Sequence, residues 1–196
     1  MRGIILWLGL QMISVFLYAQ EKPEGLFINS KAPDIKTTDQ YGKELRLKDI
    51  IKDSLVLLVF YRGYWDPYSI KNLVKLQDSL PLLQSKRVKL VAVTPEKPES
   101  ILKTMEKTKA GFSIVNDKEL KLMKAYAVAY EVDERTLSRY KNADIDLLAV
   151  NGQKEKAWLP VPAIYIIGVE GTIFYRYFEA DYKKWPAVQE ILEQIR

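Results

Sequence analysis

The sequence has 196 residues, of which 48% are hydrophobic and 28% are charged. This length and composition suit one globular domain with a proper core and argue against wholesale disorder. The chain contains no cysteine and no histidine. Thiol redox catalysis, cysteine nucleophiles, Ser-His-Asp triads and metal sites built on thiolate or imidazole are therefore excluded. We expect neither a metal ion nor a cofactor.

The net charge of +5 comes from 30 basic and 25 acidic residues. Lysines are spread among glutamates and aspartates along the chain and form no dense basic cluster. Such a distribution is typical of a solvated surface, so we expect no nucleic-acid binding.

The first 20 residues differ from the rest of the chain. Arg2 precedes an almost wholly apolar run over residues 4–17, and the small residue Ala19 follows. This pattern predicts a signal peptide over residues 1–19, cleaved near Ala19, and hence an exported protein that is periplasmic or secreted. The alternative is an uncleaved N-terminal anchor, which would be the only contact with a membrane. Gln11 and Ser14 interrupt the run and favour cleavage.

A flexible leader is predicted over residues 20–31, and a single domain over residues 32–196. Continuous apolar runs predict buried strands, and a 3/4 apolar spacing predicts amphipathic helices. The predicted strands are 44–47, 55–61, 88–93, 112–115, 161–167 and 172–178. The predicted helices are one from Pro67 that ends or kinks at Pro81, then 98–107, 116–126, 134–141 and 185–195. This order predicts an α/β fold, with a central mixed β-sheet and helices on both faces.

The stretch FYRGYWDPYS, residues 60–69, joins a buried strand to the start of a helix. Unpaired backbone N–H groups and the helix dipole favour negative charge at such a place. Asp66 followed by Pro67 is a favourable N-cap, and Ser69 lies in the first turn.

This stretch resembles the Phe-Tyr-Arg-Gly-X-Trp-Cys-Pro-X-Cys pattern of the peroxiredoxin-like branch of the AhpC/TSA family (alkyl hydroperoxide reductase/thiol-specific antioxidant), within the thioredoxin superfamily. The resemblance spans roughly residues 26–195 and implies a thioredoxin-like fold. Further similar segments are Ala32-Pro33-Asp34, Ala92-Val93-Thr94-Pro95-Glu96, Leu159-Pro160-Val161-Pro162-Ala163, Gly171-Thr172-Ile173 and Asp181-Tyr182. By this resemblance Asp66 and Ser69 stand where the family has its two cysteines, so the family's thiol cycle cannot run here.

Two roles stay open for Asp66. It either caps the helix in place of the thiolate, or acts as a general base or nucleophile with Arg62, a lysine or a tyrosine as its partner. Arg62 in turn either supports an anion near the helix start or pairs with an acidic neighbour. The aromatic residues around the turn either line the core or a cleft, or mark a binding surface if exposed. They are Tyr61, Tyr64, Trp65 and Tyr68.

The resemblance also implies that the Val161–Pro162 bond is cis and faces the turn, where backbone groups would bind an extended peptide or protein. The alternative is an ordinary trans proline at the start of a strand. No catalytic residue is assigned. The candidate binding residues are Arg62, Trp65, Tyr68, Val161 and Pro162.

The leading hypothesis is therefore an exported peroxiredoxin-like protein that has lost thiol chemistry and serves as a binding or scaffolding module, either as a monomer or as a homodimer. One alternative is a thiol-independent enzyme that uses Asp66. The other is the antioxidant oxidoreductase activity of the AhpC/TSA family, which would rest on analogy of fold alone.

Overall fold

A five-stranded sheet forms the centre of the protein, seen in a computed structural model that describes residues 22–195. The predicted signal peptide lies outside the described residues. The strand order is β5-β4-β3-β8-β9. The strands β3, β4 and β5 are parallel, β8 pairs antiparallel with β3, and β9 pairs antiparallel with β8. The strands are β3 (Leu55–Phe60), β4 (Val88–Thr94), β5 (Ser113–Asn116), β8 (Ala163–Ile167) and β9 (Ile173–Phe178). The predicted α/β fold with a mixed sheet is confirmed.

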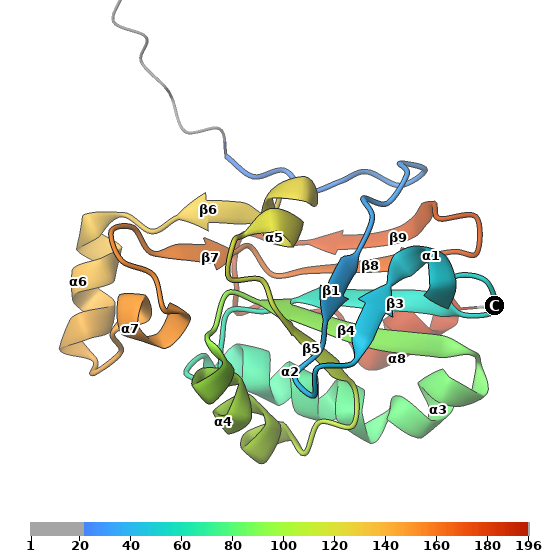
Figure 1. Ribbon diagram of the computed structural model, residues 1–196, viewed down its shortest axis with the longest axis horizontal. Helices are drawn as coiled ribbons and strands as arrows, with labels where there is room; N and C mark the ends of the chain where they lie inside the picture. The colour runs from blue at the N-terminus through green and yellow to red at the C-terminus, as the bar shows by residue number, and fades with distance from the viewer. Residues whose placement is uncertain (1–21, 196) are drawn as a thin grey trace, which may run out of the picture.

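Apolar layers cover both faces of this sheet, because alternate side chains of a strand point to opposite sides. On β3, Leu57 and Val59 belong to one layer, whereas Val56 and Leu58 belong to the other. Figure 1 shows the helices of the first layer below the sheet: α2 (Pro67–Asp78), α3 (Leu80–Ser85), α4 (Pro98–Thr108) and α8 (Val188–Glu193). The second layer includes residues of α1 (Leu47–Ile50) and α5 (Lys121–Ala125).

Two small sheets accompany the central one. The hairpin of β1 (Lys36–Thr38) and β2 (Glu44–Arg46) crosses in front of the large sheet in Figure 1. At the left of that view, β6 (Ala129–Glu131) pairs with β7 (Trp158–Pro160), beside α6 (Glu134–Asn142) and α7 (Leu147–Asn151). In this region the sequence predicted only the helix over 134–141, which is confirmed. A third apolar cluster holds it together and contains Val132, Leu147, Ala157 and Leu159.

Two predicted helices are shorter than expected. The helix predicted over 116–126 begins at Lys121, because Leu120 adopts a left-handed conformation (φ 58°) and the Asp117 carboxylate accepts the N–H groups of Leu122 and Met123 at 3.1 and 2.7 Å. The helix predicted over 185–195 covers only 188–193, since Ala187 is still extended at ψ 144°. The kink predicted at Pro81 is confirmed, because α2 ends at Asp78 and α3 begins at Leu80.

The prediction of a cis bond before Pro162 was wrong. Residues 22–195 contain no cis peptide bond, so the Val161–Pro162 bond is trans. The Val161 N–H donates to the Val128 carbonyl at 2.8 Å, and the Pro162 carbonyl accepts from the Glu179 N–H at 3.4 Å. These contacts hold the chain extended between β7 and β8, and the trans isomer is intrinsically the lower in free energy. The strand predicted over 161–167 accordingly begins only at Ala163, as β8.

Residues 24–31, predicted as part of a flexible leader, are packed against the domain. The Asn29 N–H donates to the Ile173 carbonyl at 2.8 Å, and the Ile173 N–H donates to the Ser30 carbonyl at 3.0 Å. Gly25 has φ +68°, and a Cβ there would lie 2.6 Å from the Phe178 ring, so the close approach requires glycine. This segment therefore covers part of edge strand β9 and belongs to the domain.

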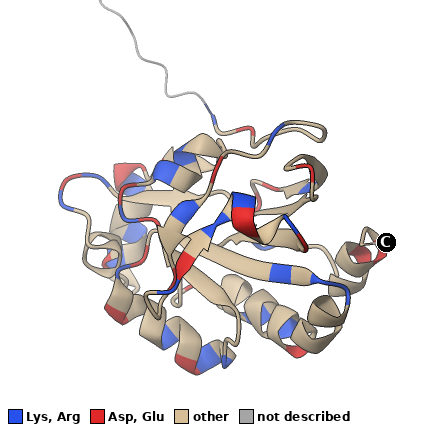
Figure 2. Ribbon diagram, turned by 45° about the vertical axis from the view of Figure 1, so that its right-hand side comes forward, with Lys and Arg blue, Asp and Glu red and all other residues tan. Residues whose placement is uncertain are grey.

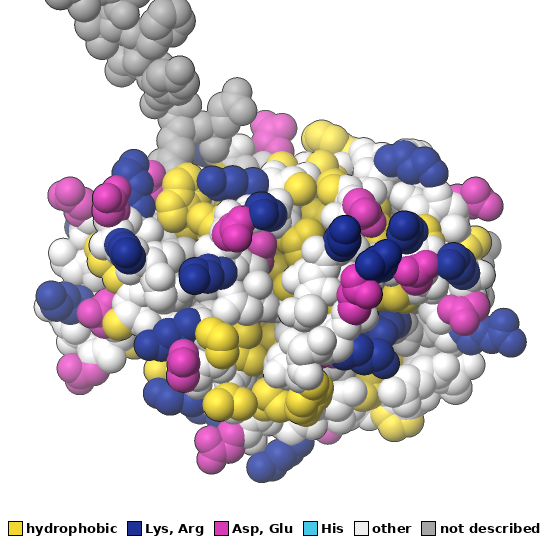
Figure 3. All heavy atoms as spheres, viewed as in Figure 1, with side chains coloured by type: hydrophobic (Ala, Val, Ile, Leu, Met, Phe, Trp, Pro, Cys, Tyr) yellow, Lys and Arg dark blue, Asp and Glu magenta, His cyan; other side chains and the backbone are white. Residues whose placement is uncertain are grey.

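Charged groups of both signs are interspersed over the helices and loops (Figure 2). On the face drawn in Figure 3, hydrophobic side chains lie in groups between them. None of the helices within residues 22–195 is both long enough and apolar enough to span a bilayer.

Candidate functional site

Asp66 caps the N-terminus of α2, as one of its two predicted roles required. Its carboxylate accepts the N–H groups of Tyr68 and Ser69, both at 3.3 Å, and the Ser69 hydroxyl at 2.6 Å. Pro67 follows at the first helical position. The Asp66 side chain is only 1% exposed. Both carboxylate oxygens are thus engaged by the helix start, and solvent does not reach them.

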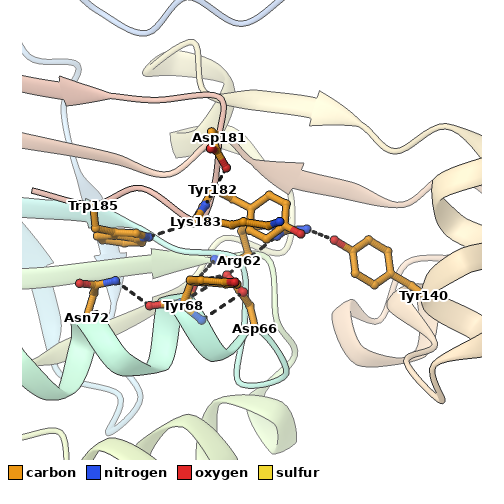
Figure 4. Close-up of polar contacts among 10 residues, drawn as sticks. Arg62, Asp66, Tyr68, Asn72, Tyr140, Asp181, Tyr182, Lys183 and Trp185 are labelled. Atoms are coloured by element: carbon orange, nitrogen blue, oxygen red, sulfur yellow. Dashed lines mark hydrogen bonds and ion pairs between the residues drawn. The ribbon is translucent and has the colours of Figure 1, made fainter.

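Arg62 lies beside this cap as a buried cation. Its Nη1 is 3.9 Å from the Asp66 carboxylate, and its Nη2 donates to the Tyr140 hydroxyl. The guanidinium carbon lies 4.0 Å from the centre of the Tyr182 ring (Figure 4). It lies 4.9 Å from the centre of the Trp65 ring. The side chain is 2% exposed. Of the two roles predicted for Arg62, the structure therefore shows pairing with an acidic neighbour, inside an aromatic enclosure.

The four aromatic residues of the turn do not form one cluster. Tyr61 is fully buried and Tyr64 packs against lysines of α4. Trp65 meets the ring of Tyr140 edge-on at 5.0 Å, and Tyr68 meets that of Tyr182 at 5.8 Å. Only Tyr68, which is 36% exposed, offers substantial ring surface to a partner. Of the predicted binding residues, Trp65 therefore lies against Arg62, whereas Tyr68 lies against Tyr182.

Glu96 is a residue of this site that the sequence reasoning did not single out. It lies two residues after the end of β4 and is fully buried. Its carboxylate accepts the Tyr64 N–H at 2.8 Å, the Thr104 hydroxyl at 3.1 Å and the Tyr61 hydroxyl at 3.3 Å. Burial raises the pKa of its carboxyl to about 7, against the effect of these hydrogen bonds. An acidic residue two positions after the end of an apolar central strand was the available signal.

Gly63 permits the close approach of Glu96 to the turn. Its φ is +151°, and a Cβ there would lie 2.8 Å from the Glu96 carboxylate and 2.5 Å from the Trp65 indole nitrogen. A side chain at this position would displace one or both groups. Gly63 thus allows the turn to pass close to both Glu96 and Trp65.

Val161 and Pro162 lie in a neighbouring cavity rather than against Asp66. The cavity has a volume of about 530 Å³. Its other lining residues are Lys22, Pro23, Tyr130, Glu131, Ala180 and Tyr182. Tyr182 belongs to both places, since it lines the cavity and covers the Arg62 guanidinium. The segment Asp181-Tyr182 carried only a similarity in the sequence, and its position over Arg62 follows from the tertiary structure.

This geometry bears on what the site can do chemically. A catalytic carboxylate must reach its substrate or a water molecule, and the Asp66 side chain is 1% exposed with both oxygens bonded to the helix start. The groups that do face solvent are aromatic side chains, the 530 Å³ cavity and its flanking charges. Such surfaces are suited to binding.

The sheet order and the strand-to-helix turn define a protein of the thioredoxin-like class. In this protein the buried Asp66 carboxylate caps the helix that follows the central strand. The AhpC/TSA family matches residues 28–176, and the chain belongs to this family.

Individual relatives are distant. A protein named "Putative peroxiredoxin bcp" from Buchnera aphidicola subsp. Schizaphis graminum is 26% identical over 97 residues, which is 50% of this chain and 61% of that protein. This chain thus matches less than two thirds of that relative's length.

Solved structures agree in fold. Peroxidoxin BcpB from Mycobacterium tuberculosis has a TM-score of 0.63 at 14% identity, over 86% of this chain and 95% of that one. A cysteine-to-serine mutant of peroxiredoxin 6 from Arenicola marina has a TM-score of 0.69 at 18% identity, over 87% and 72%. At these identities the likeness concerns the fold alone.

Proposed function

We propose that this protein is an exported member of the AhpC/TSA family that has lost thiol chemistry and acts as a binding or scaffolding module for an extended peptide or protein. The observation that carries the proposal is the state of Asp66. This residue stands at the position of the family's first cysteine, and its carboxylate is buried and engaged in capping α2. Ser69, at the second cysteine position, completes the cap.

The proposed binding surface is the cavity beside Pro162. Tyr182 and Tyr130 line it, and aromatic side chains contribute a large contact area at a small cost in conformational entropy. Its mouth includes the exposed residue Ala180 and the charges of Lys22 and Glu131. An extended peptide could place apolar side chains against Val161 and Pro162 and polar groups against these charges.

Export is supported by the N-terminal sequence, with Arg2, the apolar run over 4–17 and Ala19. N-terminal sequencing of the protein recovered from the exported fraction checks this part of the proposal. We expect the mature chain to begin at Gln20. A chain that retains Arg2 and fractionates with membranes would instead be anchored.

Loss of thiol chemistry predicts that the purified protein consumes no peroxide with a thiol reductant beyond a protein-free control. The reason is the absence of any thiol, since the chain has no cysteine. The measurement is peroxide loss over time, with a cysteine-containing peroxiredoxin as the positive control. Turnover above the protein-free rate would overturn the proposal.

The binding surface is tested by obstructing the cavity without touching the core. Ala180→Arg places a long side chain at its mouth, where Ala180 is exposed. We expect this variant to lose the partners that the wild-type protein retains in pull-down from the exported fraction. The matched control is Val169→Arg, in an exposed turn outside the cavity. Equal retention by both variants would place binding elsewhere.

A further inference from the structure

The tip of the β1–β2 hairpin is fixed against edge strand β5. The Gln40 side-chain amide donates to the Phe112 carbonyl at 2.9 Å and accepts from the Ile114 N–H at 2.6 Å, so it pairs with the strand edge as another backbone would. The Asp39 carboxylate accepts the Ser113 hydroxyl at 3.1 Å. In Figure 1 the hairpin accordingly reaches across the sheet to β5. These bonds make the hairpin tip a preorganised wall.

A cavity of about 480 Å³ lies behind this wall, at the end of the sheet opposite Asp66. It is bounded by the hairpin tip and by the residues at which β3, β4 and β5 begin. The lining residues are Asp39, Tyr41, Lys43, Ser54, Leu80, Gln84, Arg87, Val88, Lys89, Leu90, Gly111, Phe112 and Ser113.

Basic side chains outnumber acidic ones among the residues that line this cavity. Lys43, Arg87 and Lys89 line it, and within residues 22–195 none of the three forms a salt bridge. Among the described residues that line the cavity, Asp39 alone is acidic. Its carboxylate accepts the backbone N–H groups of Tyr41 and Lys43, both at 3.0 Å, and the Ser113 hydroxyl. Three hydrogen bonds thus keep the Asp39 carboxylate at the hairpin tip.

This excess of positive charge affects the pKa of Lys89. Burial lowers the pKa of its ammonium group, the positive charge of Lys43 lowers it further, and Asp39 opposes both effects. An anion placed between the two lysines would remove this repulsion. The hydroxyl of Tyr41 offers a further donor at the same place.

We propose that this cavity is a second binding site, which takes a small organic anion carrying two or more negative charges, as in phosphate esters and polycarboxylates. Lys43, Lys89 and Arg87 neutralise the anionic groups, and the apolar floor at Leu80 and Phe112 receives the carbon skeleton. The site shares no residue with the Asp66 turn or with the cavity at Pro162. It is therefore independent of the binding function proposed above.

The test uses the purified protein with pyrophosphate and, separately, with citrate, by isothermal titration calorimetry at low ionic strength, where charge screening is weak. We expect saturable binding of one equivalent of at least one probe, and the tighter of the two identifies phosphate or carboxylate chemistry. Lys43→Gln/Lys89→Gln should weaken this binding by about tenfold or more, because two charge-assisted contacts are lost.

Two further variants distinguish a specific anion site from nonspecific electrostatic attraction between the anion and the protein. Lys71→Gln/Lys75→Gln removes the same charge from an exposed face of α2, and affinity should stay within about twofold. Gln40→Leu keeps every charge but frees the hairpin tip, and affinity should fall. Absence of saturable binding for both probes, or equal weakening by the two lysine pairs, would overturn the proposal. Thermal unfolding of each variant verifies that it is folded.

Discussion

Replacing Asp66 with alanine is expected to lower the free energy of unfolding by about 3–5 kcal/mol, measured by urea denaturation. The substitution removes the carboxylate that pairs with Arg62 and leaves that guanidinium charged in a site where it is 2% exposed. It also frees the two backbone N–H groups that Asp66 accepts at the start of α2. Breaking a buried pair from one side costs more than the pair itself contributes, because the remaining charge stays desolvated.

Asp133→Ala is the matched control for this prediction. Asp133 is also an N-cap, accepting the Thr136 N–H at 2.9 Å, but it is exposed and has no buried cation beside it. Its loss should lower the free energy of unfolding by clearly less than the loss of Asp66, because only the helix cap is removed. The double variant Arg62→Met/Asp66→Asn removes both buried charges and should recover part of the loss seen in Asp66→Ala. Equal costs for Asp66→Ala and Asp133→Ala would mean that Asp66 acts as a helix cap alone.

Glu96 is expected to make the stability of the protein fall as the pH rises from about 4.5 to about 7. Burial raises the pKa of this carboxyl from 4.5 to about 7 in the folded state. Between these values the folded protein therefore binds more protons than the unfolded chain, and the free energy of unfolding decreases with pH. The full effect is about 3–4 kcal/mol at most, because each pKa unit corresponds to about 1.4 kcal/mol.

Glu96→Gln tests this by imitating the protonated carboxyl. Its amide oxygen can accept the Tyr64 N–H, and its amide nitrogen can donate to the Thr104 hydroxyl. We expect the variant to be more stable than the wild-type protein at pH 8, and to lose most of the slope between pH 4.5 and 7 in urea denaturation. Burial also raises the pKa of Asp117, which leaves a smaller slope of the same sign.

The control for this pH dependence is Glu99→Gln, on the exposed side of α4 close to Glu96 in the sequence. This variant should keep the wild-type slope, because it removes a glutamate without altering the buried carboxyl. If Glu96→Gln also keeps the slope, the pH dependence arises from another group.

Local sequence patterns predicted the elements with strong periodicity. The apolar run at 55–61 became the central strand, and the Pro67 and Pro81 positions marked the limits of α2 closely. The patterns were weakest over residues 127–160, where β6 and β7 are three residues each and pair only with one another. Strands this short carry little periodicity, and partners distant in sequence stabilise them.

The candidate site likewise has one part that local sequence predicts and another that depends on the tertiary structure. The Asp66-Pro67 cap was predictable, because a helix N-cap involves neighbouring residues only. Tyr140, Tyr182 and Glu96 meet the turn from three separate segments, and no local pattern indicates that they converge there. The prediction of a cis bond before Pro162 was wrong because it was based on a family pattern alone. It took no account of the contacts of Val161 and Pro162 that hold the chain in the trans form.

By itself, the sequence determined that this member of the AhpC/TSA family has no thiol, and the resemblance of residues 60–69 to the family's motif predicted that Asp66 and Ser69 take its two cysteine positions. Only the tertiary structure decided that Asp66 and Arg62 form a buried pair, that Glu96 is enclosed below the turn, and that three basic residues share a cavity with Asp39. The reason is physical, since the free energy of a charge depends on its burial and its neighbours, and these come from segments far apart in the chain.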